Sequence, residues 1–279
     1  MLCNDEMAAD IKAHIRAARS RRTPKRKDND LECAPEMSRP FIEETRFYKS
    51  LHFCAQEAQS RMLKQEPERL VLDYTRTMMA FLLFNSRPDS IVMIGLGGGS
   101  LAKFCYRELP QTRIDVVEIN PHVVALRNAF HVPPDDDRFH VHLDDGARFI
   151  GQYPDRYNVL LVDAYTRVGI PTQLASMEFY DSCKRALRAN GVMVLNLYCK
   201  DADVHIGRVR QCFDNSFFVV DEKDGTNRVV IARRGALPPH ASVPPQRPAH
   251  VRPAAWSPLQ TAFLRAKSAL KKSQVSALG

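Results

Sequence analysis

The segment IVMIGLGGGSLAKF, residues 91–104, joins an apolar run to helix-forming residues through four glycines in five positions. Glycine loses more backbone freedom on folding than other residues, so such a cluster indicates a sharp turn or a close approach to another group. In open α/β sheets, ligands bind beyond the carboxyl ends of the strands, where backbone amides begin the next helix. We therefore expect Gly95, Gly97, Gly98 and Gly99 to face a bound ligand.

Strand and helix patterns alternate on the C-terminal side of this turn. Strands are predicted at residues 91–94, 114–119, 139–143, 159–163, 192–197, 217–220 and 229–232. Helices are predicted at residues 101–108, 121–130, 146–152, 176–189 and 202–213. Only DEKDGTN separates the last two strands, and its Asp-Gly pair predicts a hairpin. A mostly parallel sheet that ends in an antiparallel hairpin is typical of Rossmann-like class I methyltransferase domains.

This domain is expected to span residues 74–235, after a small β-rich unit at residues 41–73. Within that unit, ETRFYKSLHF, EAQSRML and ERLVLDY resemble short strands, and a helical run follows at residues 75–84. Residues 1–40 form a basic extension with seven basic residues between positions 16 and 27. Their composition is typical of disorder.

The last predicted unit, residues 236–279, is a proline-rich linker followed by a basic helix. Leu259, Phe263, Leu264 and Leu270 recur at helical spacing, and the basic residues Arg265, Lys267, Lys271 and Lys272 are expected on the opposite face. Such a helix either packs on the domain or contacts a partner, a membrane surface or nucleic acid.

Composition excludes several classes of protein. Seven cysteines occur without a CxxC pair, which disfavours a disulfide framework and a paired-cysteine zinc site and favours the cytoplasm. No run of 18 apolar residues occurs, so we expect no membrane span. The net charge of +8 lies in the flanks: residues 1–40 carry +2, and residues 233–279 contain eight basic residues and no acidic one, which leaves residues 41–232 at about −2. Nucleic-acid binding is therefore not expected of the core, and only weak contact by the basic tails stays open.

Three acidic residues end successive predicted strands at the edge where the ligand is expected. Glu118 follows Gly97 by 21 positions, the spacing of a carboxylate that binds ribose hydroxyls. Asp145, before Gly146, either accepts a hydrogen bond from an adenine amino group or caps a helix. Asp163 ends the fourth strand beside the same pocket and is a further candidate to bind the co-substrate.

The motifs GLGGGSL, VEINP, LDDG, YNVLLVDAY and GVMVLNLYCKD, in this order, resemble the spermidine synthase-like family, the polyamine aminopropyltransferases and their relatives. The similarity spans about residues 41–233. It implies that the glycine turn, Glu118, Asp145 and Gly146 hold the adenosyl part of S-adenosylmethionine or of its decarboxylated form as a co-substrate. It also implies a homodimer. Two motifs further resemble the methyltransferase half of a eukaryotic enzyme that modifies an elongation factor.

Two positions depart from the family pattern. The family has an aspartate at Gly98, which helps to hold the amine of the aminopropyl group, and a second acid at Thr166. An aspartate at Gly98 would repel the carboxylate of S-adenosylmethionine, whereas glycine amides at a helix N-terminus accept it. We therefore expect methyl transfer to an amine or similar nucleophile on a small molecule or a protein. Aminopropyl transfer and a non-catalytic nucleoside-binding module remain as alternatives.

The acceptor side is less well defined by the sequence. Asp163, Tyr165 and Tyr74 are candidates to orient an attacking amine or to accept its proton, and Gln59 and Arg167 are candidates to line the acceptor site. Each has a structural alternative: a loop cap, a packed aromatic ring or a solvated contact. Both transfers are displacements at a sulfonium carbon, so positioning supplies most of the rate and no metal is required.

Overall fold

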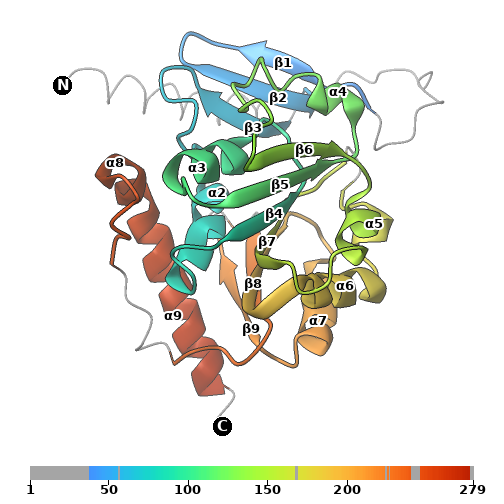
Figure 1. Cartoon of the computed structure of the whole chain (residues 1–279), viewed down its shortest axis with the longest axis vertical. Coiled ribbons are helices and arrows are strands. Elements are labelled where there is room, and N and C mark those ends of the chain that lie inside the picture. Colours follow the sequence, from blue (N-terminus) through green and yellow to red (C-terminus); the bar gives the residue numbers. More distant parts are fainter. Residues whose placement is uncertain are drawn as a thin grey trace.

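The computed structural model describes residues 38–55, 57–166, 169–223, 225, 227–239 and 246–276. It contains a small N-terminal sheet above a larger central sheet that carries helices on both faces (Figure 1). The extension predicted for residues 1–40 lies outside the described residues apart from its last three positions.

The central sheet has seven strands in the order β6-β5-β4-β7-β8-β10-β9. Strands β6, β5, β4, β7 and β8 are parallel, and β10 is antiparallel to both β8 and β9. This order confirms the class I methyltransferase-like fold and the C-terminal hairpin. The strands are β4 Ser90–Ile94, β5 Arg113–Glu118, β6 Phe139–Leu143, β7 Tyr157–Val162, β8 Leu187–Leu197, β9 Phe217–Asp221 and β10 Arg228–Arg233.

Both faces of the central strands are buried, because side chains that alternate along a strand point to opposite helical layers. In β4, Ile91 and Met93 pack in the core that includes α3, whereas Val92 and Ile94 pack in the core that includes α5, α6 and α7. Figure 1 shows α3 on one side of the sheet and these three helices on the other. The helices are α3 Ser100–Glu108, α4 Pro121–Val124, α5 Gly146–Gly151, α6 Met177–Ala186 and α7 Ala202–Cys212.

Two helices are shorter than predicted. Helix α4 ends at Val124 instead of residue 130, and the chain continues in turns that bury Phe130 beside the glycine turn. Helix α6 ends at Ala186 instead of residue 189, because Leu187 already pairs with Tyr157 at the start of β8. In both cases tertiary pairing and packing override a local helical pattern.

The N-terminal sheet is antiparallel in the order β1-β2-β3, from β1 Phe41–Glu44, β2 Tyr48–Cys54 and β3 Glu57–Leu63. The predicted strand at ERLVLDY was wrong. The guanidinium of Arg76 donates to the carbonyl groups of Leu70 and Val71 at 2.9 and 3.0 Å, so a helix turn rather than a neighbouring strand uses these acceptors. That turn begins α2 Asp73–Met78, which continues as η2 Met79–Leu83.

The C-terminal residues form α8 Pro253–Trp256, η5 Ser257–Leu259 and α9 Gln260–Ser276, and α9 runs along the side of the domain (Figure 1). Phe263 and Leu270 are about 1% exposed and belong to the main apolar core. Arg265, which was expected on the face opposite the apolar residues, has partners within the domain. Its guanidinium donates to Glu222 at 2.7 Å and to Thr77 at 2.9 Å.

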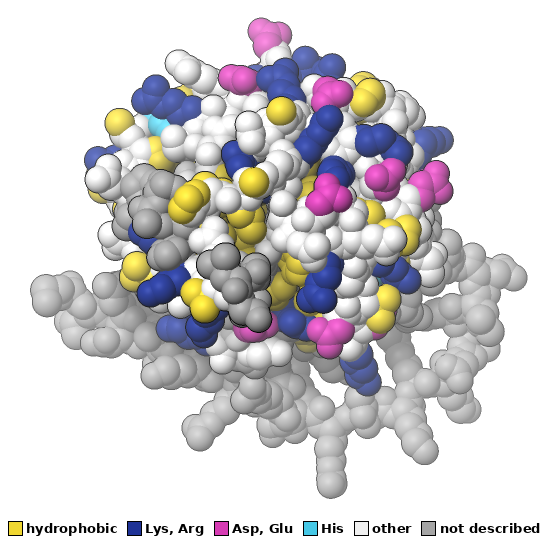
Figure 2. All heavy atoms as spheres, turned by 90° about the horizontal axis from the view of Figure 1, so that it is seen from below, with side chains coloured by type: hydrophobic (Ala, Val, Ile, Leu, Met, Phe, Trp, Pro, Cys, Tyr) yellow, Lys and Arg dark blue, Asp and Glu magenta, His cyan; other side chains and the backbone are white. Residues whose placement is uncertain are grey.

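Charges of both signs are mixed on the surface. On the face shown in Figure 2, Lys and Arg side chains are interspersed with Asp and Glu, and apolar side chains lie in the depression between them. This mixture agrees with the small net charge of residues 41–232. None of the helices in the described ranges combines the length and apolarity that crossing a membrane requires.

One buried cation makes the stability of the fold pH-dependent. Lys103 on α3 is 3% exposed and donates to the Phe130 carbonyl at 2.7 Å, and burial lowers its pKa to about 7. At Lys103 the unfolded chain therefore holds more protons than the folded chain between about pH 7 and about pH 10.5, so the contribution of this residue to the free energy of unfolding rises with pH across this window. Urea denaturation at several pH values should show that the free energy of unfolding of Lys103→Met, relative to that of the wild type, becomes less favourable as pH rises through this window. An equal slope in both proteins would contradict the assignment.

Candidate active site

A cavity of about 860 Å³ lies at the carboxyl ends of β4, β5 and β7, which is large enough for a nucleoside and a second substrate. Its wall includes the glycine turn, the start of α5, residues of α2 and the end of β8. Gln59, Ser60 and Arg61 of β3 contribute to the lining from the N-terminal sheet. The small sheet therefore closes one side of a site that the central sheet builds.

Gly95 and Gly97 line this cavity, as the sequence predicts. Gly95 has φ +98°, and a Cβ atom there would lie 2.2 Å from the carbonyl oxygen of Asp163. Gly97 has φ +51°, and the nearest atom to a Cβ there would be the Ser60 Cβ at 3.8 Å. The turn thus brings the backbone to the cavity surface without a side chain to fill it.

Gly98 and Gly99 serve packing instead of lining the cavity. A Cβ at Gly98 would lie 2.6 Å from Ser60 Oγ and 3.0 Å from the Phe130 ring, and one at Gly99 would lie 2.4 Å from Val132 Cγ2. Ser60 Oγ also lies 3.3 Å from Ser100 Oγ. The N-terminal sheet and the chain after α4 therefore occupy the space where side chains would project from these two positions.

Glu118 and Gly97 both line the cavity wall, as the spacing of 21 positions between them predicts. The Glu118 carboxylate accepts the backbone N–H groups of Leu96 and Asn120, each at 2.9 Å, and so links the glycine turn to the end of β5. Burial raises the pKa of Glu118, while these backbone donors oppose the rise.

Asp145 lies in the same wall and caps α5. Its Oδ1 accepts the N–H groups of Ala147 and Arg148 at 2.7 and 3.1 Å, which is the structural role that its position before a helix allows. A Cβ on Gly146 would lie 2.4 Å from Ile94 Cγ2, so glycine permits the close packing of α5 on β4. The carboxylate is therefore held at the cavity by the start of the helix.

Asp163 follows β7, on the other side of β4 from Glu118, and sits in a buried chain of hydrogen bonds. Tyr74 donates to one carboxylate oxygen at 3.2 Å, and the Asn196 amide donates to the other at 2.9 Å. Asn227 in turn donates to Asn196 Oδ1 at 2.9 Å. Burial raises the pKa of Asp163 above its usual range, and burial and the Asp163 charge together raise the pKa of Tyr74.

Tyr165 contributes its ring to the cavity, but its hydroxyl is engaged by the backbone. It donates to the Asn196 carbonyl at 2.5 Å and accepts the Tyr198 N–H at 2.6 Å. These contacts favour the structural alternative for this residue, because they tie the loop after β7 to the end of β8. Arg167 lies outside the described residues.

The cavity carries an excess of negative charge. Glu118, Asp145 and Asp163 line it, and among the described residues none of them forms an ion pair with Lys or Arg. Two further carboxylates, Asp73 and Glu222, are each paired with an arginine at 2.7 Å. Such a cavity favours cationic ligands.

The sequence of this chain is similar to known transferases. The family model of the spermine/spermidine synthase domain matches residues 72–210. The polyamine aminopropyltransferase of Chromobacterium violaceum is 38% identical over 172 residues, which cover 61% of this chain and 65% of that protein. The eEF1A lysine and N-terminal methyltransferase of Xenopus laevis is 35% identical over 127 residues, which cover 42% of this chain and 18% of that protein.

Two solved structures share the fold. A probable spermidine synthase from Corynebacterium glutamicum has a TM-score of 0.62 at 19% identity, over 71% of this chain and 77% of that chain. Human methyltransferase-like protein 13, solved in complex with SAH, has a TM-score of 0.54 at 23% identity, over 71% of this chain and 93% of that chain.

Fold and site thus define a class I methyltransferase-like domain with an acidic cavity at the carboxyl edge of its sheet. The comparisons support a spermidine synthase-like family for this chain, as its motifs predict. It spans less than two thirds of the length of the curated relatives described above.

Proposed function

We propose that this protein transfers an aminopropyl group from decarboxylated S-adenosylmethionine to an amine of the polyamine type. The observation that carries the proposal is the set of three cavity carboxylates without a cationic partner in the described part of the chain. The decarboxylated donor carries a sulfonium and an ammonium group and no carboxylate, and the acceptor is also a cation. The similarity to a polyamine aminopropyltransferase supports the same reaction.

In this proposal the two ends of the cavity have separate tasks. The glycine turn and Glu118 bind the ribose, and Asp145 contacts the base. At the other end, Asp163 and Tyr74 orient the acceptor amine. Its nitrogen attacks the propyl carbon bonded to sulfur, the C–S bond breaks, and methylthioadenosine leaves. The amine proton passes to Asp163 or, through it, to water.

The donor preference tests the proposal directly. Isothermal titration calorimetry should show that decarboxylated S-adenosylmethionine binds at least tenfold more tightly than S-adenosylmethionine, a difference of about 1.4 kcal/mol. The reason is that the added carboxylate enters a cavity that already holds unpaired carboxylates. With putrescine as acceptor, spermidine and methylthioadenosine should form. Tighter binding of S-adenosylmethionine would overturn aminopropyl transfer as the main reaction.

Methyl transfer is the second candidate, and Gly98 is the observation that favours it. The position where the family has an aspartate carries no charge, and Ser60 Oγ fills the space beside it. A relative in Xenopus laevis is also a methyltransferase. A methylated amine product together with tighter binding of S-adenosylmethionine would identify this reaction. Failure to bind either donor or methylthioadenosine would indicate a non-catalytic module.

Replacement of Glu118 tests the ribose site. Glu118→Ala should weaken methylthioadenosine binding by about 1.5–3 kcal/mol, because hydrogen bonds to a charged acceptor are lost. The matched control is Asp144→Asn, because Asp144 is a nearby carboxylate that pairs with Arg148 and lies outside the large cavity. It should bind as the wild type does. Unchanged affinity in a folded Glu118→Ala protein would remove this residue from the site.

A further inference from the structure

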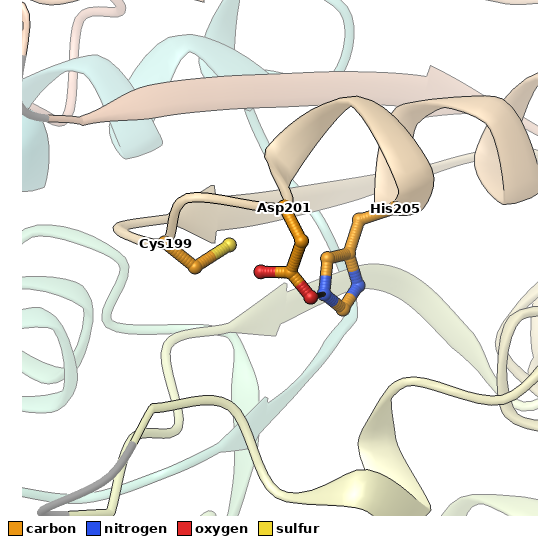
Figure 3. A group of neighbouring side chains, drawn as sticks. All are labelled: Cys199, Asp201 and His205. Atoms are coloured by element: carbon orange, nitrogen blue, oxygen red, sulfur yellow. Dashed lines mark ion pairs between the residues drawn. The ribbon is translucent and has the colours of Figure 1, made fainter.

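A second group of reactive side chains lies where β8 leads into α7. Cys199, Asp201 and His205 each offer one ligand atom, and these three atoms lie within 4.8 Å of one another (Figure 3). The imidazole of His205 is 1% exposed, Cys199 is half-buried and Asp201 is open to solvent. Within the residues that the structure describes, this is the one such convergence of possible metal ligands. The proposed transfer reaction uses none of them.

The orientation of His205 suits metal binding. Its Nδ1 lies 2.7 Å from the Tyr180 hydroxyl, and its Nε2 lies 3.7 Å from Asp201 Oδ2. When Nδ1 carries the proton and donates to the tyrosine oxygen, Nε2 presents its lone pair to Asp201. Histidines that bind metals usually have their other ring nitrogen held in this way, which fixes both the tautomer and the direction of the ring.

Distances and ligand types indicate which cation fits. Two ligand atoms on a tetrahedral Zn²⁺ with bonds of about 2.0–2.1 Å are roughly 3.4 Å apart. The 3.7 Å between His205 Nε2 and Asp201 Oδ2 is already close to this separation, and the Cys199 sulfur lies within 4.8 Å of the ligand atoms of both residues. Sulfur, imidazole nitrogen and carboxylate oxygen together suit zinc better than calcium or magnesium, which prefer oxygen ligands.

We propose that Cys199, Asp201 and His205 bind a Zn²⁺ ion, with water as the fourth ligand. The site lies next to the cavity: Tyr198 lines the cavity, and its N–H is bound to the Tyr165 hydroxyl at 2.6 Å. An ion held by Cys199 and by the first turn of α7 ties this helix to the chain that carries Tyr198. The ion therefore supports the cavity wall and takes no part in group transfer.

Cobalt spectroscopy on the full-length protein, after removal of metal with a chelator, tests this site. One equivalent of Co²⁺ should give the visible bands of a tetrahedral ion and a thiolate-to-metal charge-transfer band, and Zn²⁺ should displace it. Cys199→Ser should lose the charge-transfer band. Asp201→Asn should weaken Co²⁺ binding by about tenfold or more. Asp203→Asn is the matched control, because this exposed carboxylate of the same helix pairs with Arg228 and should leave binding unchanged.

A further variant avoids the risk that replacing buried His205 unfolds the chain. Tyr180→Phe keeps the ring and removes the hydroxyl that holds Nδ1, so it should weaken Co²⁺ binding by about 10–100-fold. Circular dichroism verifies its fold. The proposal is overturned if the wild type binds no Co²⁺ equivalent, or if Cys199→Ser retains the charge-transfer band. It is also overturned if Asp201→Asn binds as tightly as Asp203→Asn.

Discussion

Replacing Asp163 by asparagine is expected to slow group transfer by about 10²–10⁴-fold, the range for loss of a positioned proton acceptor. Asparagine has nearly the same size and keeps an oxygen that can accept from Tyr74. It cannot take up the amine proton or balance the charge of an ammonium group. Steady-state rates with saturating donor and acceptor measure the loss, and calorimetry should show that methylthioadenosine, which carries no ammonium group, binds about as tightly as it does to the wild type.

The pH dependence distinguishes proton acceptance from a structural role. Asp163 accepts a proton only as a carboxylate, and burial raises its pKa. The wild-type rate should therefore fall with decreasing pH at a higher pH than an ordinary carboxyl group would give, and Asp163→Asn should lack this limb. Asp73→Asn is the matched control, because this cavity carboxylate is 64% exposed and paired with Arg76. Its rate should change less than tenfold. Equal effects of both variants would show that Asp163 contributes only its negative charge to the cavity and does not accept the proton.

The parts of the site that the sequence predicts are those that follow from chain direction. The end of each parallel strand lies at the same sheet edge, so an acid after a strand reaches the cavity whatever the details of packing. Glu118, Asp145 and Asp163 were placed correctly for this reason. Their roles toward a donor or an acceptor remain predictions.

Contacts between distant segments could not be predicted in this way. Asn196 and Asn227 complete the hydrogen-bond chain at Asp163, yet Asn196 lies in β8 and Asn227 directly precedes β10, so their meeting depends on the antiparallel register of these two strands. An asparagine within the apolar run VMVLNLY was the available signal. Gly98 faces Ser60 only because the N-terminal sheet docks there. The proposed zinc site could not be predicted from the sequence either, because its three ligands differ in type and the sequence contains no paired cysteines.

The C-terminal helix shows how a basic pattern can conceal a core element. Arg265 looks like one of four solvent-facing cations, but Glu222 in the cavity wall is its partner. The partner lies 43 positions earlier in the chain, and helical spacing carries no information about it. Residues 246–276 thus belong to the folded domain, and they reach the cavity through one buried ion pair.

Phe263→Ala is expected to lower the free energy of unfolding by about 3–5 kcal/mol, because it leaves a cavity where a buried ring packed. Phe263 is 1% exposed and stacks edge-on against Trp256, with ring centroids 5.1 Å apart. Leu264, the next residue, is 60% exposed and provides the matched control. Leu264→Ala should change the free energy of unfolding by less than about 0.5 kcal/mol.

Urea denaturation followed by circular dichroism measures the free energy of unfolding of both variants. If both variants lowered the free energy of unfolding by the same small amount, α9 would be an appendage to the domain. Deleting residues 246–279 would then leave donor binding intact. If Phe263→Ala alone is strongly destabilised, the helix is part of the core that holds Glu222 and the cavity in place.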